Sequence, residues 1–317
     1  MKLYFAPLEG INGPQYRRIH HKHFSGVDKY YAPFISPTCD HLFTPKELRN
    51  LAPEHNIGIP LVPQLMSKNP EDVLWASGEL FQMGYDEVNL NLGCPSGTVV
   101  AKGKGAGMLS DPEWLNEFLY QVFRKAEGNI SVKTRLGMTD PEEFHRLLQI
   151  FSRYPISLLI IHPRVRSDFY KNPVKPEYFE QALICYEGPV CYNGGLYTSD
   201  SVRDFSSAHP SVEQIMLGQG LIANPALAQQ SKGLGELKRE TLQTFHDELF
   251  HEYLDVFHSA RNTVYHMKEL WFYMGRLFDG GEKLFKQIKK AQDTAAYESA
   301  VREIFRTLPM NQDVLWK

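Results

Sequence analysis

The chain has 317 residues, of which 43% are hydrophobic and 22% charged, and its formal net charge at pH 7 is −3. This length is enough for one large α/β domain with a smaller one, or for two ordinary domains. The mildly acidic balance excludes a generally basic nucleic-acid-binding protein, although it allows a local basic face. The sequence contains no apolar run long enough to span a bilayer.

The first ten residues, MKLYFAPLEG, predict a first strand and not a secretory signal peptide, because Pro7, Glu9 and Gly10 interrupt the apolar run early. We therefore expect a cytoplasmic protein. The four cysteines form no C-x-x-C pair and have no zinc-ligand spacing, so neither disulfides nor a zinc site are expected. The HHKH segment at 20–23 fits a solvated helix face better than a metal site.

Short apolar or β-branched segments recur through the first two-thirds of the chain and alternate with helical patterns. The eight predicted strands are Lys2–Leu8, Lys29–Ile35, Pro60–Met66, Glu87–Gly93, Ile130–Gly137, Leu158–Val165, Pro189–Leu196 and Gln214–Leu221. Strands that alternate with helices form parallel sheets, and eight such units predict a closed (β/α)8 TIM barrel. Helices are expected over Pro70–Met83 and Asp111–Ala126, whereas the prolines within Ser36–Ile59 leave the second unit least clear.

The segment 87–107 is the most informative part of the sequence. Alternating apolar and asparagine residues predict a strand that ends at Gly93-Cys94-Pro95, and a mobile loop rich in glycine and lysine is expected after it. A cysteine at a strand end, followed by such a loop, indicates reactive chemistry. The structural alternative is a small buried hydrophobic residue before a proline.

Two further strand ends carry ionisable side chains. Lys133 lies in a strand suited to a barrel interior, where a lysine is costly unless it meets an anionic group. It suits the N1–O2 edge of a flavin, and a salt bridge to a carboxylate is the alternative. His162 ends an apolar strand and precedes Arg164 and Arg166, which favours contact with a cofactor or a substrate phosphate over a role as a core histidine.

The last two predicted strands end in glycine-containing triplets, Asn193-Gly194-Gly195 and Gly218-Gln219-Gly220. Barrel enzymes commonly bind a phosphate in this region through backbone N–H groups, and glycine lets the backbone approach closely. Either triplet alone would fit an ordinary tight turn. Together they predict a phosphate site.

The chain resembles the tRNA-dihydrouridine synthases over nearly its whole length. Their N-x-G-C-P signature is present as Asn91-Leu92-Gly93-Cys94-Pro95, and the strand-end motifs occur in the same order. The family is FMN-dependent and reduces the C5–C6 double bond of uridines in tRNA, with NADPH as the electron donor. The resemblance therefore implies FMN, NADPH and a D-loop uridine of tRNA as the partners of this chain.

The resemblance also implies roles for particular residues. Flavin contacts are implied for Pro7, Leu8, Glu9, Gln64, Lys133, His162, Asn193, Gly194, Gly195, Gly218 and Gln219. The chain departs from the family pattern at three of its motifs. Leu8 replaces the usual methionine, Pro163 replaces a glycine, and Gln219 replaces an arginine, which removes a charge from the phosphate site.

The reaction implied by the resemblance is a hydride transfer from N5 of reduced FMN to C6 of the uracil. An acid on the opposite face must then protonate C5, and Cys94 is placed to do so as a thiol. Asn91 and Arg135 are expected to hold the base at its carbonyl edges. Because a uridine in folded tRNA is inaccessible, the base must be turned out into the barrel.

After about residue 232 the strand patterns stop. Amphipathic helices are predicted at Leu237–Phe257, Arg261–Phe278, Gly281–Ala291 and Ala295–Leu308, which together indicate a helical bundle. We therefore expect a catalytic barrel domain over 1–232 and an all-α, tRNA-binding domain over 233–317.

The segment 261–290 contains seven basic and three acidic residues, with aromatic residues between them. A basic face that includes Lys286, Lys289 and Lys290 suits the phosphate backbone of tRNA, although most such faces are simply solvated. Lys102 and Lys104 on the Cys94 loop are expected to add contacts with the RNA. Recognition of RNA by shape needs no base-reading motif.

Two other functions stay open at this point. A flavin barrel of the dihydroorotate-dehydrogenase type would act on a free pyrimidine, for which a basic helical domain serves no purpose. A tRNA-binding homologue without turnover is favoured only by Gln219. We expect a monomer without a metal, and no dinucleotide-binding motif is visible that would distinguish NADPH from NADH.

Overall fold

A computed structural model of the chain describes residues 1–314. The strands are β1 (Lys2–Phe5), β2 (Lys29–Tyr31), β3 (Leu61–Val62), β4 (Gln64–Leu65), β5 (Glu87–Leu92), β6 (Asn129–Arg135), β7 (Leu159–His162), β8 (Val190–Asn193) and β9 (Gln214–Leu217). The α-helices are α1 (Pro14–His23), α2 (Pro45–Leu51), α3 (Pro70–Gln82), α4 (Gly97–Val100), α5 (Pro112–Phe123), α6 (Glu143–Phe151), α7 (Pro176–Cys185), α8 (Ser199–Ala208), α9 (Gln219–Ala223), α10 (Leu227–Ser231), α11 (Arg239–Phe257), α12 (Ala260–Met274), α13 (Glu282–Lys290) and α14 (Thr294–Thr307). Short 3-10 helices are η1 (Pro53–His55), η2 (Gly105–Ser110), η3 (Arg166–Asp168) and η4 (Gly275–Leu277).

The strands form one parallel sheet in the order β3-β2-β1-β9-β8-β7-β6-β5-β4. Its two end strands, β3 and β4, are separated in the chain only by Pro63. The segment 61–65 therefore pairs with β2 on one side and with β5 on the other, which closes the sheet into a barrel. The predicted (β/α)8 barrel is confirmed. Its third strand is split because proline has no N–H to donate to the sheet.

Most other elements follow the sequence patterns. Each predicted strand contains an observed one, apart from β6, which begins one residue early, and the helices α3, α5 and α11–α14 fall on their predicted segments. In the unclear second unit, the helix α2 begins at Pro45. Thr44 caps it, and the Glu47 side chain reaches back to the Thr44 N–H, so that two backbone donors are satisfied.

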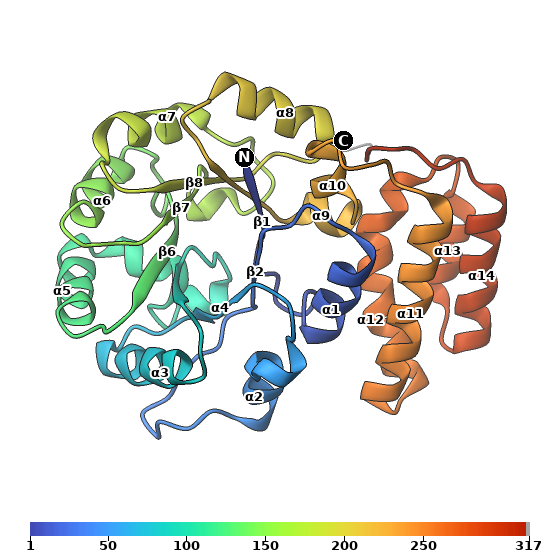
Figure 1. Cartoon of the computed structure of the whole chain (residues 1–317), viewed down its shortest axis with the longest axis horizontal. Helices are drawn as coiled ribbons and strands as arrows, with labels where there is room; N and C mark the ends of the chain where they lie inside the picture. Colours follow the sequence, from blue (N-terminus) through green and yellow to red (C-terminus); the bar gives the residue numbers. More distant parts are fainter. Residues whose placement is uncertain (315–317) are drawn as a thin grey trace. The chain divides into compact units, whose positions relative to one another are not determined.

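The inside of the barrel is a packed core. Tyr4, Tyr31, Ile160, Cys191 and Met216 are buried there in one cluster. In such a barrel a ligand binds at the C-terminal ends of the strands, because side chains fill the interior. Helices α3, α5, α6 and α7 lie outside strands β5–β8 (Figure 1).

The chain divides into two compact units. The first consists of residues 1–7, 29–195 and 211–216, and the second of residues 8–28, 196–210 and 217–317. The second unit thus contains α1, α8, α9 and α10 as well as the C-terminal helices. Its limits therefore do not coincide with a single domain boundary after residue 232. The domain limits 1–232 and 233–317 stay a prediction.

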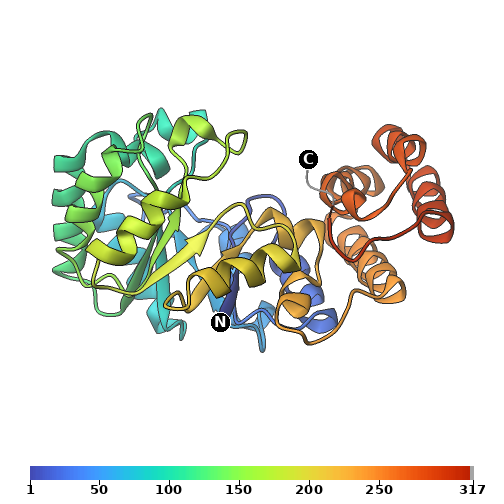
Figure 2. The same cartoon turned by 90° about the horizontal axis from the view of Figure 1, so that it is seen from above.

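Helices α11–α14 belong to the second unit and pack side by side (Figure 2). A buried polar cluster lies between three of them, where Trp271 Nε1 donates to the Tyr297 hydroxyl at 2.8 Å and that hydroxyl lies 2.7 Å from His246 Nε2. No helix among residues 1–314 is both long enough and apolar enough to cross a membrane.

Candidate active site

A chain of buried polar side chains crosses strands β4, β5 and β6. Asn91 Nδ2 donates to Gln64 Oε1, Gln64 Nε2 donates to Asn89 Oδ1, and Asn89 Nδ2 donates to Ser131 Oγ, each at 2.8 Å. We call these four residues the amide network. The inward-facing positions of parallel barrel strands bring them together, and each bond fixes the orientation of the next amide.

The amide network ends at the backbone of the predicted acid. Asn91 Oδ1 accepts the backbone N–H groups of Gly93, at 3.0 Å, and Cys94, at 2.9 Å. These bonds hold the chain as it leaves β5. Asn91 is buried, and its oxygen and one of its two amide N–H groups are in use, so its predicted contact with the substrate base stays a prediction.

The loop after Cys94 differs from the open, mobile segment that its glycines suggested. It contains α4 and η2, and residues 105–109 are buried. Gly105, with φ +57°, lies so close to Cys94 that a Cβ atom on it would be 2.9 Å from the Cys94 Cβ. The glycines therefore allow this loop to pack tightly against the cysteine.

Arg135 ties the Cys94 loop to the loop between β7 and α7. Its Nε donates to the Gly93 carbonyl at 2.9 Å, and its Nη1 donates to the carbonyls of Val165, at 3.1 Å, and Phe169, at 2.9 Å. The guanidinium also lies 5.2 Å from the centre of the Tyr170 ring. Nη2 is buried without a hydrogen-bond partner, so it is the donor left for the predicted contact with the base.

Lys133 lies on β6 and has no anionic partner among the residues that the structure describes. Among residues 1–314 its ammonium makes no ion pair, which excludes the carboxylate salt bridge considered above. Burial, followed by the charge of Arg135, lowers the pKa of Lys133 to about 7. Lys133 pairs with Asn91 across the sheet, three residues before Cys94, which places it on the strand next to the cysteine. An anionic ligand here would restore the charged form.

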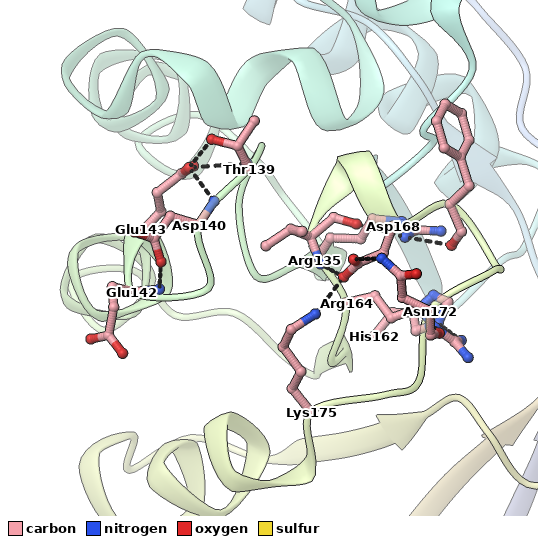
Figure 3. A network of polar contacts seen from close by, with 12 residues as sticks. Arg135, Thr139, Asp140, Glu142, Glu143, His162, Arg164, Asp168, Asn172 and Lys175 are labelled. Carbon is pink, nitrogen blue, oxygen red and sulfur yellow. Dashed lines mark hydrogen bonds and ion pairs between the residues drawn. The ribbon is translucent and has the colours of Figure 1, made fainter.

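His162 ends β7 beside two arginines (Figure 3). Its Nε2 lies 2.8 Å from Nη1 of Arg164, which can only donate, so Nε2 is the acceptor and Nδ1 carries the proton. Burial, with the charges of Arg135, Lys133 and Arg164, holds the pKa of His162 well below its usual value. Gly194, with φ +141°, packs against this ring, since a Cβ atom there would lie 2.8 Å from Cδ2.

The β7–α7 loop is organised by Asp168, a residue that the sequence analysis did not single out. Its carboxylate accepts the Val165 N–H at 3.0 Å, Asn172 Nδ2 at 2.6 Å and the Lys175 ammonium at 2.6 Å (Figure 3). Hydrogen bonds from Lys175 and Asn172 hold the pKa of Asp168 below its usual value, despite the opposing effect of burial. Asp168 therefore joins three parts of this loop beside the site.

The other predicted residues divide between the two units. The first unit contains Pro7, Lys102, Lys104, Asn193 and Gly195. Asn193 Nδ2 donates to the Met216 carbonyl at 2.8 Å. The second unit contains Leu8, Glu9, Gly218, Gln219, Lys286, Lys289 and Lys290. The structure thus brings Gln64, Asn91, Cys94, Lys133, Arg135, His162 and Gly194 together, and the roles of all these residues stay predictions.

The chain has the fold and the site of a barrel enzyme. Its parallel (β/α)8 barrel carries a fixed cysteine, an unpaired lysine and a neutral histidine at the C-terminal ends of the strands. The dihydrouridine synthase family profile matches residues 4–313, almost the entire chain. The chain belongs to the dihydrouridine synthase family, and as a member it is a flavin-dependent oxidoreductase.

Two relatives match over most of their length. The tRNA-dihydrouridine(16) synthase of Pseudomonas putida is 27% identical over 311 residues, which cover 93% of this chain and 94% of the relative. The tRNA-dihydrouridine(16) synthase of Aquipseudomonas alcaligenes is 26% identical and covers 92% of this chain and 96% of the relative.

Solved structures of other enzymes share the fold. Morphinone reductase superposes with a TM-score of 0.52 at 13% identity, over 75% of this chain and 87% of that one. The old yellow enzyme from Trypanosoma cruzi has a TM-score of 0.53 at 12% identity, over 75% of this chain and 89% of that one. At this identity the likeness shows the barrel fold alone.

The residues of the first unit fit a flavin. Lys133 and Arg164 have no carboxylate partner among the described residues, and a buried guanidinium nitrogen of Arg135 is unpaired. Such a group of cations suits an anionic ligand. Gly194 and Gly195 have positive φ values of +141° and +71°, a backbone conformation that favours glycine, and Gly194 lies against His162. Lys133 and His162 would hold the ring, and Gly194 and Gly195 would face the phosphate end.

Proposed function

We propose that this chain is an FMN-dependent tRNA-dihydrouridine synthase that reduces the C5–C6 double bond of a D-loop uridine with NADPH as electron donor. The observation that carries the proposal is the position of Cys94. Asn91 holds its backbone at the end of β5, and the unpaired Lys133 is the partner of Asn91 on the neighbouring strand β6. The names of the full-length relatives supply tRNA as the substrate class.

When bound and reduced, FMN supplies the hydride that adds to C6 of the uracil. The Cys94 thiol donates the balancing proton to C5, and solvent later restores that proton. Arg135 offers its unpaired Nη2 to a carbonyl oxygen of the base, which stabilises the charge that develops there. Neutral His162 would help to hold the ring of the cofactor, with its Nδ1–H available as a donor.

We propose position 16 of the tRNA as the target, because the two relatives described above, each matched over more than nine-tenths of the chain, carry that position in their names. Mass spectrometry of tRNA fragments after reaction would locate the reduced uridine. Reduction at another D-loop position would overturn this choice while leaving the reaction itself intact. We also propose that the protein is a cytoplasmic monomer, as expected from the sequence.

The first experiment is the absorbance spectrum of the purified protein, before and after addition of NADPH and then of unmodified tRNA. The proposed function requires a flavin spectrum that bleaches with NADPH and recovers with tRNA. Bleaching without recovery on tRNA, but with recovery on a free pyrimidine, would show a small-molecule oxidoreductase instead. A colourless protein that FMN cannot reconstitute would show a tRNA-binding homologue without turnover.

A further inference from the structure

Phe169 has a backbone conformation that glycine normally adopts. Its φ is 49° and its ψ is −106°, close to the first central position of a type II′ turn, where a side chain is strained. Packing in the core does not explain a phenylalanine there, since 37% of its surface is exposed. Strained residues that persist are concentrated at functional sites, so an observed outlier of this kind suggests a role for the side chain.

The Phe169 ring lies beside the Cys94 loop. The Phe169 carbonyl accepts Nη1 of Arg135 at 2.9 Å, which fixes the backbone of this residue to the site. The Arg166 guanidinium lies 5.0 Å from the centre of the ring. Arg166 Nε in turn donates to the Pro95 carbonyl at 3.2 Å, one residue after Cys94. A cation therefore holds the ring at the edge of the loop that carries the proposed acid.

An exposed aromatic ring with a cation beside it is suited to a nucleotide. A base stacks on the ring, while the guanidinium meets a neighbouring phosphate. The carboxylate next to Phe169 does not oppose this, because Asp168 is buried and paired with Lys175 at 2.6 Å. Lys171, two residues further along, is exposed and adds positive charge to the same loop.

We propose that Phe169 and Arg166 form a stacking surface for the nucleotide next to the target uridine. This inference rests on the proposed function, because it assumes an RNA substrate. When one base is turned out of its stack, the adjacent base loses a stacking partner. The Phe169 ring replaces that partner, and Arg166 binds the phosphate between the two nucleotides. The surface thereby increases the affinity for RNA but not for a free uridine, which has no neighbouring nucleotide.

Phe169→Leu and Phe169→Tyr are the matched variants, because both keep a side chain in the strained conformation and only tyrosine keeps an aromatic face. We expect Phe169→Leu to raise the KM and the Kd for unmodified tRNA about tenfold at fixed salt, in line with the loss of one stacked base. Phe169→Tyr stays within about twofold of the wild type. The rate of flavin bleaching by NADPH and kcat at saturating tRNA are unchanged in both variants.

Phe169→Gly tests the structural alternative, in which the ring only supports the fold. Glycine relieves the strain, so our proposal expects an equal or higher Tm together with the weaker tRNA binding. A lower Tm with wild-type tRNA affinity would overturn it, and so would equal affinities of the wild type and Phe169→Leu. Wild-type protein that binds no tRNA would refute the proposed function as well, which distinguishes the two failures.

Discussion

Asn91 and Gln64 are joined by a buried hydrogen bond of 2.8 Å from Nδ2 of the first to Oε1 of the second. This bond turns Oδ1 of Asn91 toward the backbone N–H groups of Gly93 and Cys94. The position of the proposed acid thus depends on amides that lie on the neighbouring strand β4 and within β5. In this structure Asn91 is a positioning residue for Cys94.

Asn91→Ala should therefore lower both the free energy of unfolding and the rate of uridine reduction. The variant leaves the two N–H groups and the Gln64 oxygen without a partner, which should cost about 2–4 kcal/mol of unfolding free energy. Asn89→Ala is the matched control, because Asn89 belongs to the amide network but does not contact the Cys94 loop. Urea unfolding should show both variants destabilised, whereas Asn91→Ala should slow uridine reduction more than Asn89→Ala does, at an unchanged rate of flavin bleaching. Equal slowing in both would contradict the positioning role.

Cys94→Ala should separate the two half-reactions. NADPH should still bleach the flavin at the wild-type rate, while tRNA-dependent recovery should fall by about 10²–10⁴, the usual contribution of a general acid. Cys185→Ala serves as the control, since Cys185 is an exposed free cysteine at the end of α7. Rapid mixing of reduced enzyme with tRNA measures the step directly. Wild-type recovery in Cys94→Ala would mean that another group donates the proton.

The barrel was predictable because its determinants are local. Alternating strands and helices, with polar residues just past the strands, specify both the parallel sheet and the end at which Cys94, Lys133 and His162 lie. The amide network was harder to predict from the sequence, although Asn89 and Asn91 share one face of a strand by simple alternation. What was missing is the register between strands, which places Asn89 opposite Gln64 and Ser131.

The β7–α7 loop illustrates a second limit. Asp168 and Phe169 lie in an irregular segment, where no periodicity predicts which side chains meet or which residue takes a positive φ. A phenylalanine gives no indication of that conformation, because glycine is the residue expected there. The extent of the compact units was equally hidden, since α1 and α8–α10 join the C-terminal helices through long-range packing.

The basic face of α13 can be tested by neutralising three of its lysines. Lys286, Lys289 and Lys290 are exposed on this helix. Their joint change to glutamine should weaken tRNA binding and reduce the slope of log K against log salt by roughly 2–3, at 0.7–0.9 for each lost phosphate contact. Bound flavin should be unaffected.

The matched control for α13 removes an equal number of charges elsewhere. Lys2, Arg124 and Lys125 are exposed, and they lie near the N-terminal ends of strands β1 and β6, away from the C-terminal ends where the site lies. Their change to glutamine should leave the salt slope for tRNA close to that of the wild type. If both triple variants lowered the slope equally, attraction of tRNA would be a property of net charge and not of α13.

Lys133 should make the free energy of unfolding depend on pH, and the direction of that dependence follows from its pKa. Folding lowers the pKa of this lysine from its usual 10.5 to about 7, so between these values the unfolded chain holds a proton that the folded chain has released. In protein freed of flavin, stability should therefore rise with pH from about 7 to 10, and Lys133→Met should remove this rise. At pH about 6.5 the methionine variant should be the more stable, by at most about 5 kcal/mol. Urea unfolding across this range measures the difference, and added FMN should flatten the wild-type curve, because an anion beside the ammonium favours its charged form. Parallel curves for wild type and variant would show that the buried ammonium is compensated by a group of the protein itself.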